Sequence, residues 1–532
     1  MDEAAWWRGA AIYQIYPRSF QDSTGTGTGD LKGVEQRLEH VAGLGVDAIW
    51  LSPVFRSPMA DMGYDISDYR DIDPIFGTLA DFDAVVARAH ALGLKVMIDL
   101  VFSHSSDQHP WFQESRAARE GPKADWYVWA DPKPDGSPPT NWHSVFGGPA
   151  WSWNPKRQQY YMHNFLPSQP DLNFWNADVQ EAVLDYVRFW LDRGVDGFRL
   201  DSINYCFHDR ALRDNPPLAD RSGIGLTAGT VYGYQAHLYD KTQPEMLPFL
   251  ERVRALLDLY AERTTVGEVG DEARSLQTMA AYTAGGDKLH MAYSFDLLGP
   301  TFTPAHIRDC VEAFDAAGGA WPCWAFSNHD VPRHASRFAL TGASVERIAE
   351  FSVALLVCLR GSVCLYQGEE LGLPEAELAY EDLTDPVGLA FWPEIKGRDG
   401  CRTPMPWAAE APQAGFSTAA RTWLPVAEAH RALAVDQGGP VLAAYRRMLA
   451  LRREVAELRT GALRFLDWGE QGLVFLREGP GRVVCLFNFG DNPLSFTAAD
   501  EWTLTEVAAE RGTVDGGSIT LGPYGFYLGR IS

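Results

Sequence analysis

Three carboxylates of this chain each close an apolar run, at what is predicted to be the end of a β-strand. They are Asp201, Glu268 and Asp330. A strand of a parallel barrel is buried on both sides, so the residue at its carboxyl end points into the loops where such barrels keep their chemistry. Two carboxyls in one site can act as a nucleophile and a general acid when one is ionised and the other is protonated. The three acids are therefore candidates for one catalytic site.

The spacing of the acids agrees with this interpretation. A unit of one strand and one helix in a barrel takes roughly 30 residues, and the interval from Glu268 to Asp330 fits two such units. These acids would then lie on non-adjacent strands. Each acid alone could be a helix N-cap or a surface residue after a strand, but three of them, flanked by Arg199 and His329, favour a site.

The elements that must position these acids are strand-like runs that alternate with helical patterns along most of the chain. Amphipathic patterns such as Val179–Asp192 lie between the runs and are closed by glycine. An alternating series of this length predicts an α/β fold, a (β/α)₈ TIM barrel. The predicted strands are Ala11–Tyr16, Ala48–Leu51, Lys95–Leu100, Gly197–Leu200, Thr265–Gly267, Met291–Phe295, Trp324–Ser327 and Val363–Tyr366.

Two further parts interrupt or follow the barrel. Residues 104–176, after the third strand, are rich in Trp, Tyr, Pro, Asn and Gly, which predicts an inserted subdomain over the barrel mouth. The barrel would thus comprise 1–103 and 177–440, with a loop insertion at about 370–435. Short alternating segments in 441–532 predict a C-terminal antiparallel β-sandwich domain.

Composition limits the classes of partner. The chain has 532 residues, 46% of them hydrophobic, and a formal net charge of -24. This charge disfavours nucleic acid and anionic membranes as partners, so a neutral small molecule fits better. The N-terminus has no basic and apolar leader, and no apolar run is long enough to span a bilayer. Seven cysteines without a CxxC pair indicate reduced thiols, so we expect a cytoplasmic protein.

Four ordered segments resemble the four signatures of the α-amylase superfamily, glycoside hydrolase family thirteen. They are Asp99–His104, Gly197–Asp201, Gly267–Glu268 and Ser327–Asp330. Other segments resemble the branch that contains α-glucosidases and oligo-1,6-glucosidases, which implies exo-acting release of one glucose. They are Met62–Tyr69, Gln169–Asn173, Tyr366–Glu370 and Gly397–Trp407.

The resemblance implies a role for each acid. Asp201 would be the nucleophile, Glu268 the general acid/base, and Asp330 the carboxylate that binds the ring hydroxyls. A retaining glycosidase needs two carboxyls about 5–5.5 Å apart, one ionised and one protonated. Arg199, two residues before Asp201 on the same strand, would keep the nucleophile ionised. Crowding by the other acids would raise the pKa of Glu268, as its acid role requires.

The same resemblance implies a set of substrate-binding residues. Tyr64 would be a stacking platform, while Asp61 and Arg398 would close the pocket beyond the glucose, so that only chain ends enter. The inserted subdomain could supply Phe146 and Phe165 as pocket walls that stack on sugar faces. The full predicted set is Asp61, Tyr64, His104, Phe146, Phe165, Arg199, His329 and Arg398.

Two departures from the family pattern stand out. Ser103 replaces an Asn before His104, so a hydrogen bond donated by an amide would be lost or replaced. The loop Asp22–Asp30 resembles a calcium-binding loop but carries Thr24 and Thr26 where relatives place Asn and Asp. A full set of 6–8 oxygen ligands is then harder to assemble. We therefore expect no metal or other cofactor to be required, although this loop could hold Ca or Mg weakly.

The substrate is predicted less sharply. Ser202, directly after the nucleophile, is small, which in this branch favours α-1,4 over α-1,6 linkages and hence maltose-like substrates. An alcohol or phenol could compete with water for the glucosyl-enzyme, so transglucosylation is plausible. Alternative activities are a sucrose- or isomaltose-active hydrolase, a sucrose isomerase or a trehalose-forming mutase, because all of these share the three acids.

Two more distant alternatives are disfavoured. A binding or transporter-associated homologue would have lost active-site acids or gained an anchor, and this chain retains every acid. An α-amylase that attacks polymer interiors would lack the pocket closure by Asp61 and Arg398. The expected partners are α-glucosides, with no nucleic acid and no membrane, while the oligomeric state, including a homodimer, stays open.

Overall fold

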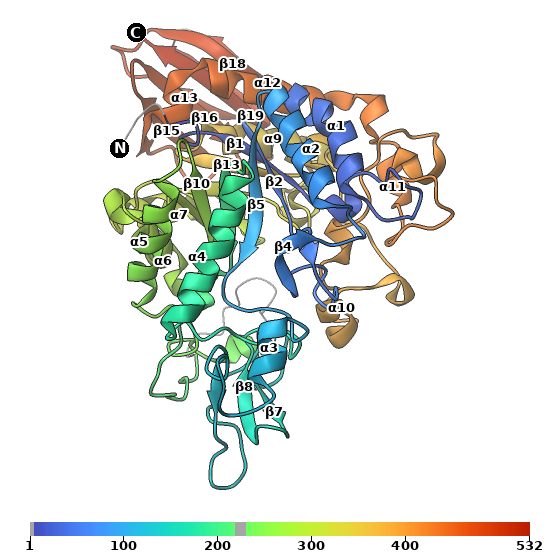
Figure 1. Cartoon of the computed structure of the whole chain (residues 1–532). Coiled ribbons are helices and arrows are strands. Elements are labelled where there is room, and N and C mark those ends of the chain that lie inside the picture. Colours follow the sequence, from blue (N-terminus) through green and yellow to red (C-terminus); the bar gives the residue numbers. More distant parts are fainter. Residues whose placement is uncertain (1–4, 219–229, 516) are drawn as a thin grey trace.

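Eight parallel strands form the centre of the protein (Figure 1). The computed structural model describes residues 5–218, 230–515 and 517–532. The strand order is β11-β10-β9-β5-β2-β1-β13-β12, and a parallel bridge between Ala292 and Pro322 joins its two ends into a barrel. The TIM barrel and all eight predicted strands are confirmed. The strands are β1 (Ala11–Ile15), β2 (Ala48–Leu51), β5 (Lys95–Val101), β9 (Gly197–Asp201), β10 (Thr264–Val269), β11 (Met291–Ser294), β12 (Cys323–Ala325) and β13 (Ser362–Tyr366).

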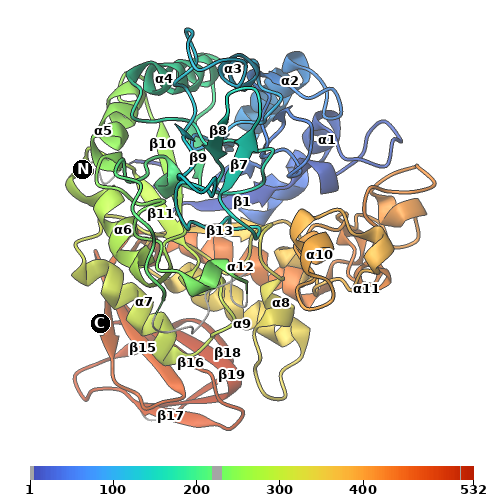
Figure 2. The same ribbon diagram turned by 90° about the horizontal axis from the view of Figure 1, so that it is seen from below.

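Helices surround the barrel, as the view from below shows (Figure 2). In α4, Val179, Val183, Val187 and Trp190 are buried, which is the spacing of one helical face. Asn176 caps this helix by accepting a hydrogen bond from the N–H of Asp178. The longer helices are α1 (Leu31–Leu44), α2 (Leu79–Ala91), α4 (Ala177–Asp192), α5 (Met246–Leu257), α6 (Ser275–Thr283), α7 (Pro304–Ala316), α9 (Val345–Cys358) and α12 (Gly439–Glu454).

The segment between β5 and α4 extends from the carboxyl ends of the strands (Figure 1). It contains α3 (Pro110–Ser115) and a small antiparallel sheet in the order β6-β8-β7. Trp142, Trp151 and Met162 form part of a separate apolar core there. We keep 104–176 as the proposed limits of this subdomain. The strands are β6 (Trp129–Ala130), β7 (Trp151–Asn154) and β8 (Gln159–Met162).

Irregular segments beside the barrel mouth complete the barrel part. A hairpin of β3 (Phe55–Arg56) and β4 (Asp68–Ile72) follows β2. The loops after β12 and β13 carry the short helices α8 (His334–Arg337), α10 (Pro386–Phe391) and α11 (Glu428–Arg431).

The C-terminal part is an antiparallel β domain at the opposite end of the barrel from the inserted segment (Figure 1). Its strands form one six-stranded sheet with apolar residues on both faces. One face packs against the barrel helices and the other encloses a small core of its own. A short helix, α13 (Ala456–Thr460), precedes it. The strands are β14 (Ala462–Leu466), β15 (Gly472–Glu478), β16 (Arg482–Asn488), β17 (Leu494–Thr497), β18 (Leu504–Asp515) and β19 (Ser518–Ile531).

Within the described residues, no helix is long and apolar enough to cross a membrane.

Two buried arginines join this domain to the barrel. Arg452 of α12 donates to the carbonyls of Gly9 (3.0 Å) and Leu458 (3.2 Å). Arg477 of β15 donates to the carbonyls of Cys358 (2.6 Å) and Leu458 (2.9 Å). Burial lowers the pKa of Arg452 to about 9 and that of Arg477 to about 10. Because of their hydrogen bonds, the two side chains satisfy backbone oxygens that would otherwise be buried without donors.

We predict that Arg452→Met destabilises the protein by about 3 kcal/mol, because several buried carbonyls lose their donor. Thermal or denaturant unfolding measures the effect. Arg446→Met, an exposed arginine on the same helix, is the control and should change stability by less than about 0.5 kcal/mol. Equal stability of the two variants would contradict the structural role of Arg452.

Candidate active site

A cavity of about 150 Å³ opens at the carboxyl ends of the barrel strands. Asp201, Glu268 and Asp330, the three acids predicted from sequence, all line it. Six of the eight predicted substrate-binding residues also line this cavity, namely Asp61, Tyr64, His104, Phe146, Phe165 and Arg398. Arg199 and His329 are fully buried against these residues, so their contact with a substrate stays a prediction.

Arg199 lies at the centre of the acidic residues. Strands β5 and β9 run in register, with Asp99 opposite Arg199. The Arg199 guanidinium donates to Asp99 (2.8 and 2.9 Å) and to Asp201 Oδ1 (2.7 Å), and its second terminal nitrogen contacts Glu268. Since a guanidinium is a rigid planar fork, one side chain fixes the relative positions of Asp201 and Glu268.

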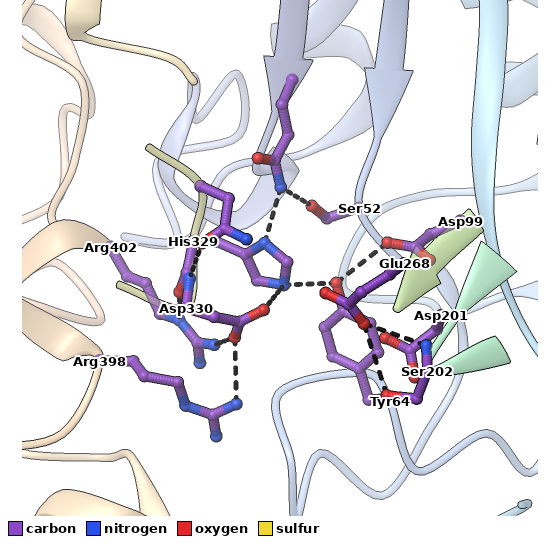
Figure 3. Close-up of polar contacts among 12 residues, drawn as sticks. Ser52, Tyr64, Asp99, Asp201, Ser202, Glu268, His329, Asp330, Arg398 and Arg402 are labelled. Carbon is purple, nitrogen blue, oxygen red and sulfur yellow. Dashed lines mark hydrogen bonds and ion pairs between the residues drawn. The ribbon is translucent and has the colours of Figure 1, made fainter. Parts of the chain in front are cut away.

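Glu268, at the end of β10, is held from two further directions. Tyr293 of β11 donates its hydroxyl to Glu268 Oε1 at 3.0 Å. The backbone N–H of Ser202 donates to Glu268 Oε2 at 3.0 Å (Figure 3). Ser202 has φ of 42°, a left-handed conformation that costs a residue other than glycine about 1–2 kcal/mol. This strained turn after Asp201 directs a donor at the neighbouring acid, a use of strain typical of functional sites.

The charge balance of the cluster differs from the sequence-based expectation, in which Arg199 keeps Asp201 ionised. Burial instead raises the pKa of Asp201 well above its ordinary range, and Glu268 and Asp99 add to this rise against the effect of Arg199. Burial also raises the pKa of Asp99 to about 6. One guanidinium cannot neutralise three adjacent carboxylates, so the cluster retains a proton more readily than a solvated aspartate does.

Asp330 is held as an ion instead. Its Oδ1 accepts from Arg402 (2.9 Å) and Arg398 (3.2 Å), and its Oδ2 lies 3.3 Å from His329 Nε2 (Figure 3). Burial opposes its charge, but His329, Arg398 and Arg402 together hold the pKa of Asp330 below its usual range. This carboxylate therefore offers only acceptor atoms, which suits it to bind hydroxyl groups.

Two residues that line the cavity, Asp61 and Arg398, form an ion pair. Arg398 Nη2 donates to Asp61 Oδ1 (2.8 Å) and to Asp385 Oδ1 (2.6 Å), and Arg398 Nε also donates to Asp385 Oδ1 (2.9 Å). Gln169 of the inserted segment donates to Asp61 Oδ2 (3.1 Å) and lies 3.1 Å from His104 Nε2. Asp61, Gln169 and Arg398 thus come from three separate loops and are joined by hydrogen bonds beside the cavity.

Tyr64 and His329 form a stacked pair beside the acids, with ring centroids 5.3 Å apart. Gln14 Nε2 lies 2.7 Å from His329 Nδ1, and Tyr64 donates its hydroxyl to Asp99 at 3.0 Å. Burial lowers the pKa of His329, so the ring is neutral. A neutral ring that accepts from Gln14 carries its proton on Nε2, facing Tyr64 and Asp330 (Figure 3).

Aromatic side chains of the inserted segment form one wall. Phe165 packs against His104 (5.1 Å between centroids), Phe146 (5.7 Å) and Tyr205 (5.3 Å). Arg398 lies over the ring of Phe146 at 5.0 Å. Burial lowers the pKa of His104 to about 3, so this wall is neutral and apolar next to the charged acids.

Comparison with known proteins agrees with this geometry. The family model "Alpha amylase, catalytic domain" matches residues 14–461. The chain belongs to the alpha-amylase family. A probable alpha-glucosidase of Rhizobium meliloti (strain 1021) is 58% identical over 495 residues, covering 91% of this chain and 90% of that protein. An oligo-1,6-glucosidase of Heyndrickxia coagulans is 35% identical over 544 residues, covering 94% and 95%.

Solved structures of the alpha-amylase fold extend the comparison. The alpha-glucosyl transfer enzyme XgtA has a TM-score of 0.96 and 56% identity, with 100% of both chains covered. The trehalulose synthase MutB from Pseudomonas mesoacidophila MX-45 has a TM-score of 0.89 and 30% identity, also with 100% of both chains covered.

Several residues of the site were not assigned a role from sequence. Asp99 could have been found, because an acid inside the apolar run Met97–Val101 requires a buried partner. The others lie in a strand interior or in irregular loops whose positions carry no periodic signal. The unassigned residues are Gln14, Asp99, Gln169, Tyr293, Asp385 and Arg402.

Ser103 contacts His104, next to which the family resemblance predicts an amide side chain. Its hydroxyl lies 3.0 Å from Nδ1 of the adjacent His104. A hydroxyl thus contacts the imidazole in place of the amide that the family resemblance implies there.

In the loop that resembles a calcium site, both carboxylates accept hydrogen bonds from neighbouring protein groups. Asp22 Oδ1 accepts from the N–H groups of Thr24 (2.9 Å) and Gly25 (2.8 Å), and Oδ2 accepts from Gly27 N–H (2.7 Å). Asp30 accepts from the N–H (2.8 Å) and hydroxyl (2.8 Å) of Ser23 and from the N–H of Gly33 (2.8 Å). Protein donors therefore occupy the carboxylate oxygens that a cation would need, so these residues do not fit a calcium ion.

We predict that millimolar Ca²⁺ and EDTA each change the thermal midpoint by less than about 1 °C, because a ligand without a site does not stabilise the folded state. Differential scanning fluorimetry measures this directly. A rise of several degrees with Ca²⁺, lost in Asp22→Asn, would show that the loop rearranges to bind the ion.

Proposed function

We propose that this protein is a retaining exo-α-glucosidase that releases α-glucose from the non-reducing end of short α-1,4-glucosides such as maltose. The observation that carries the proposal is that the three acids and the ion pair between Asp61 and Arg398 line one cavity. We take this pair to close the end of the cavity. A closed pocket beside the reacting carboxyls favours a terminal glucose over the interior of a polymer. The alpha-glucosidase names of the relatives support this choice.

The chemistry follows from the two acids that share Arg199. Asp201 attacks the anomeric carbon, Glu268 protonates the glycosidic oxygen, and the leaving unit departs as an alcohol. The glucose is then bound to Asp201 as an ester. Glu268, now ionised, takes a proton from water, whose oxygen displaces Asp201 and releases glucose with its configuration retained. The reaction requires Asp201 ionised and Glu268 protonated when the substrate is bound.

The surrounding groups have distinct tasks in this proposal. Asp330, kept ionised by its arginines, accepts hydrogen bonds from ring hydroxyls of the glucose. Tyr64 provides a platform for the sugar and is fixed by its stacking on His329. Tyr293 and the N–H of Ser202 orient Glu268 toward the leaving oxygen.

The linkage and the acceptor are part of the same proposal. Ser202 lines the cavity next to Asp201, and its small side chain favours α-1,4 substrates. The cavity wall of Phe165, Tyr205 and Phe295 is apolar beyond the acids, which supports transfer of glucose to alcohols or phenols beside hydrolysis. The similarity to an alpha-glucosyl transfer enzyme points the same way.

A second candidate is activity on sucrose or isomaltose. It is favoured by the trehalulose synthase, which has 30% identity over its full length and one mutant of which was crystallised in complex with the substrate sucrose. The three acids are equally compatible with it.

We also propose that the protein is located in the cytoplasm. All seven cysteines are free and buried, which supports this location.

We predict that the enzyme releases α-glucose from maltose faster than from isomaltose, sucrose or soluble starch. Asp201→Asn should lower this rate by about a thousandfold or more, because the nucleophile is lost. NMR identifies the first anomer and a coupled assay gives the rate. Asp287→Asn, at an exposed position, is the matched control. A preference for sucrose or isomaltose would select the second candidate, and β-glucose as first product would refute retention.

We also predict that kcat/KM falls at low pH with an apparent pKa above the ordinary aspartate value of about 3.9. The reaction needs Asp201 ionised, and burial raises its pKa, so activity is lost as pH falls through this raised value. In Asp99→Asn one neighbouring negative charge is removed, so this apparent pKa should fall. An apparent pKa of about 3.9 in the wild type, or an upward shift in the variant, would contradict the charge balance.

A further inference from the structure

A buried lysine lies behind residues that line the cavity. Lys241 is completely buried, and its ammonium donates to Tyr205 (3.1 Å), Tyr232 (2.8 Å), the carbonyl of Gly270 (2.9 Å) and Glu272 Oε1 (2.7 Å). Burying this charge costs desolvation energy, which the ion pair with Glu272 and the three further acceptors must offset. All four partners line the cavity that contains the acids.

The partners of Lys241 belong to the two loops that follow the catalytic strands. Tyr205 lies at the end of the 3-10 helix directly after Asp201, and Gly270 lies two residues after Glu268. Asn204 adds a second link between these loops by donating to the Gly270 carbonyl at 2.9 Å. The ammonium therefore joins the loop of the proposed nucleophile to the loop of the proposed acid.

Glu272 is the charged partner of Lys241 and lines the cavity. Its carboxylate is 21% exposed, whereas Lys241 is 0% exposed. Its backbone φ is 44°, a left-handed conformation unfavourable for a residue with a Cβ atom. Within the described part of the chain, Lys241 is the only hydrogen-bond donor to this carboxylate, and it binds Oε1. The second oxygen, Oε2, is left for a ligand.

The segment around Tyr232 is built as a rigid wall. The ring of Tyr232 stacks on His237 with centroids 3.6 Å apart. His237 bonds in turn to Asp240 (2.6 Å) and to the Tyr232 carbonyl (2.9 Å). Tyr232 accepts from the Lys241 ammonium, so this wall positions the lysine that in turn binds Glu272.

We propose that Glu272 binds hydroxyl groups of the leaving sugar, and that Lys241 is the positioning residue that holds Glu272 for this purpose. This assignment rests on the proposed glucosidase function and names its aglycone site. A carboxylate offers acceptors only, so its preferred ligand is a polyhydroxylated unit such as a second glucose. An aromatic aglycone without hydroxyls gains nothing from it.

The test compares maltose with p-nitrophenyl α-glucoside, whose leaving group carries no sugar hydroxyls. The variants are Glu272→Ala, Lys241→Met and their combination, with Glu245→Ala as the matched exposed control on the same segment. We expect Glu272→Ala to lower the ratio of kcat/KM for maltose to that for the aryl glucoside by about tenfold, through KM for maltose. Lys241→Met should lower the ratio in the same direction, and the double variant should lose no more than Glu272→Ala alone.

Each result decides a separate point. An unchanged ratio in Glu272→Ala, or an equal loss on both substrates, would overturn the assignment while leaving the glucosidase proposal intact. A double variant with multiplied losses would overturn the link between Lys241 and Glu272. If Lys241→Met does not fold, Glu272→Ala alone decides the hydroxyl contact. A wild-type enzyme inactive on both substrates would refute the proposed function itself.

Discussion

The site depends on one buried guanidinium. Arg199 reaches Asp99, Asp201 and the carboxylate of Glu268 from the middle of the barrel, where burial makes an unpaired charge very costly. Its rigid fork places the two proposed catalytic carboxyls relative to each other, and the parallel register of β5 and β9 places Arg199 itself. Closure of the barrel, in turn, brings β10 and its acid to the same point. The geometry of the site is therefore a property of the barrel and not of its loops alone.

The surrounding charges divide the acids into two states. Arg398 and Arg402 surround Asp330 and hold its pKa low, whereas burial and the competition of three carboxylates for Arg199 raise the pKa of Asp201. A retaining mechanism needs this division, with an ionised nucleophile, a proton for the leaving oxygen and an ionised group for the hydroxyls. In our proposal the loops contribute what the barrel cannot, namely closure of the cavity by the ion pair of Arg398 with Asp61 and a carboxylate, Glu272, for the leaving sugar.

Sequence patterns predicted the barrel, its eight strands and the three acids, because buried strands and their terminal charges leave a local signal. The positions of Arg398 and Asp61 were predicted only through the family resemblance. Asp385, Arg402 and Lys241 were not assigned, since each lies in an irregular segment whose positions carry no periodic signal. The raised pKa of Asp201 was not predicted, because sequence shows that Arg199 is near but neither how deeply the acid is buried nor how many other carboxylates share the guanidinium.

The most direct test of the central claim is to trap the proposed glucosyl-enzyme with 5-fluoro-α-D-glucosyl fluoride and to map the modified residue by mass spectrometry. We expect one added fluoroglucosyl group per chain, attached to Asp201, and no labelling in Asp201→Asn. Labelling of a different residue, or a time-dependent loss of the reagent with no covalent adduct on an active enzyme, would contradict the assignment of Asp201 and the arrangement around Arg199 that rests on it.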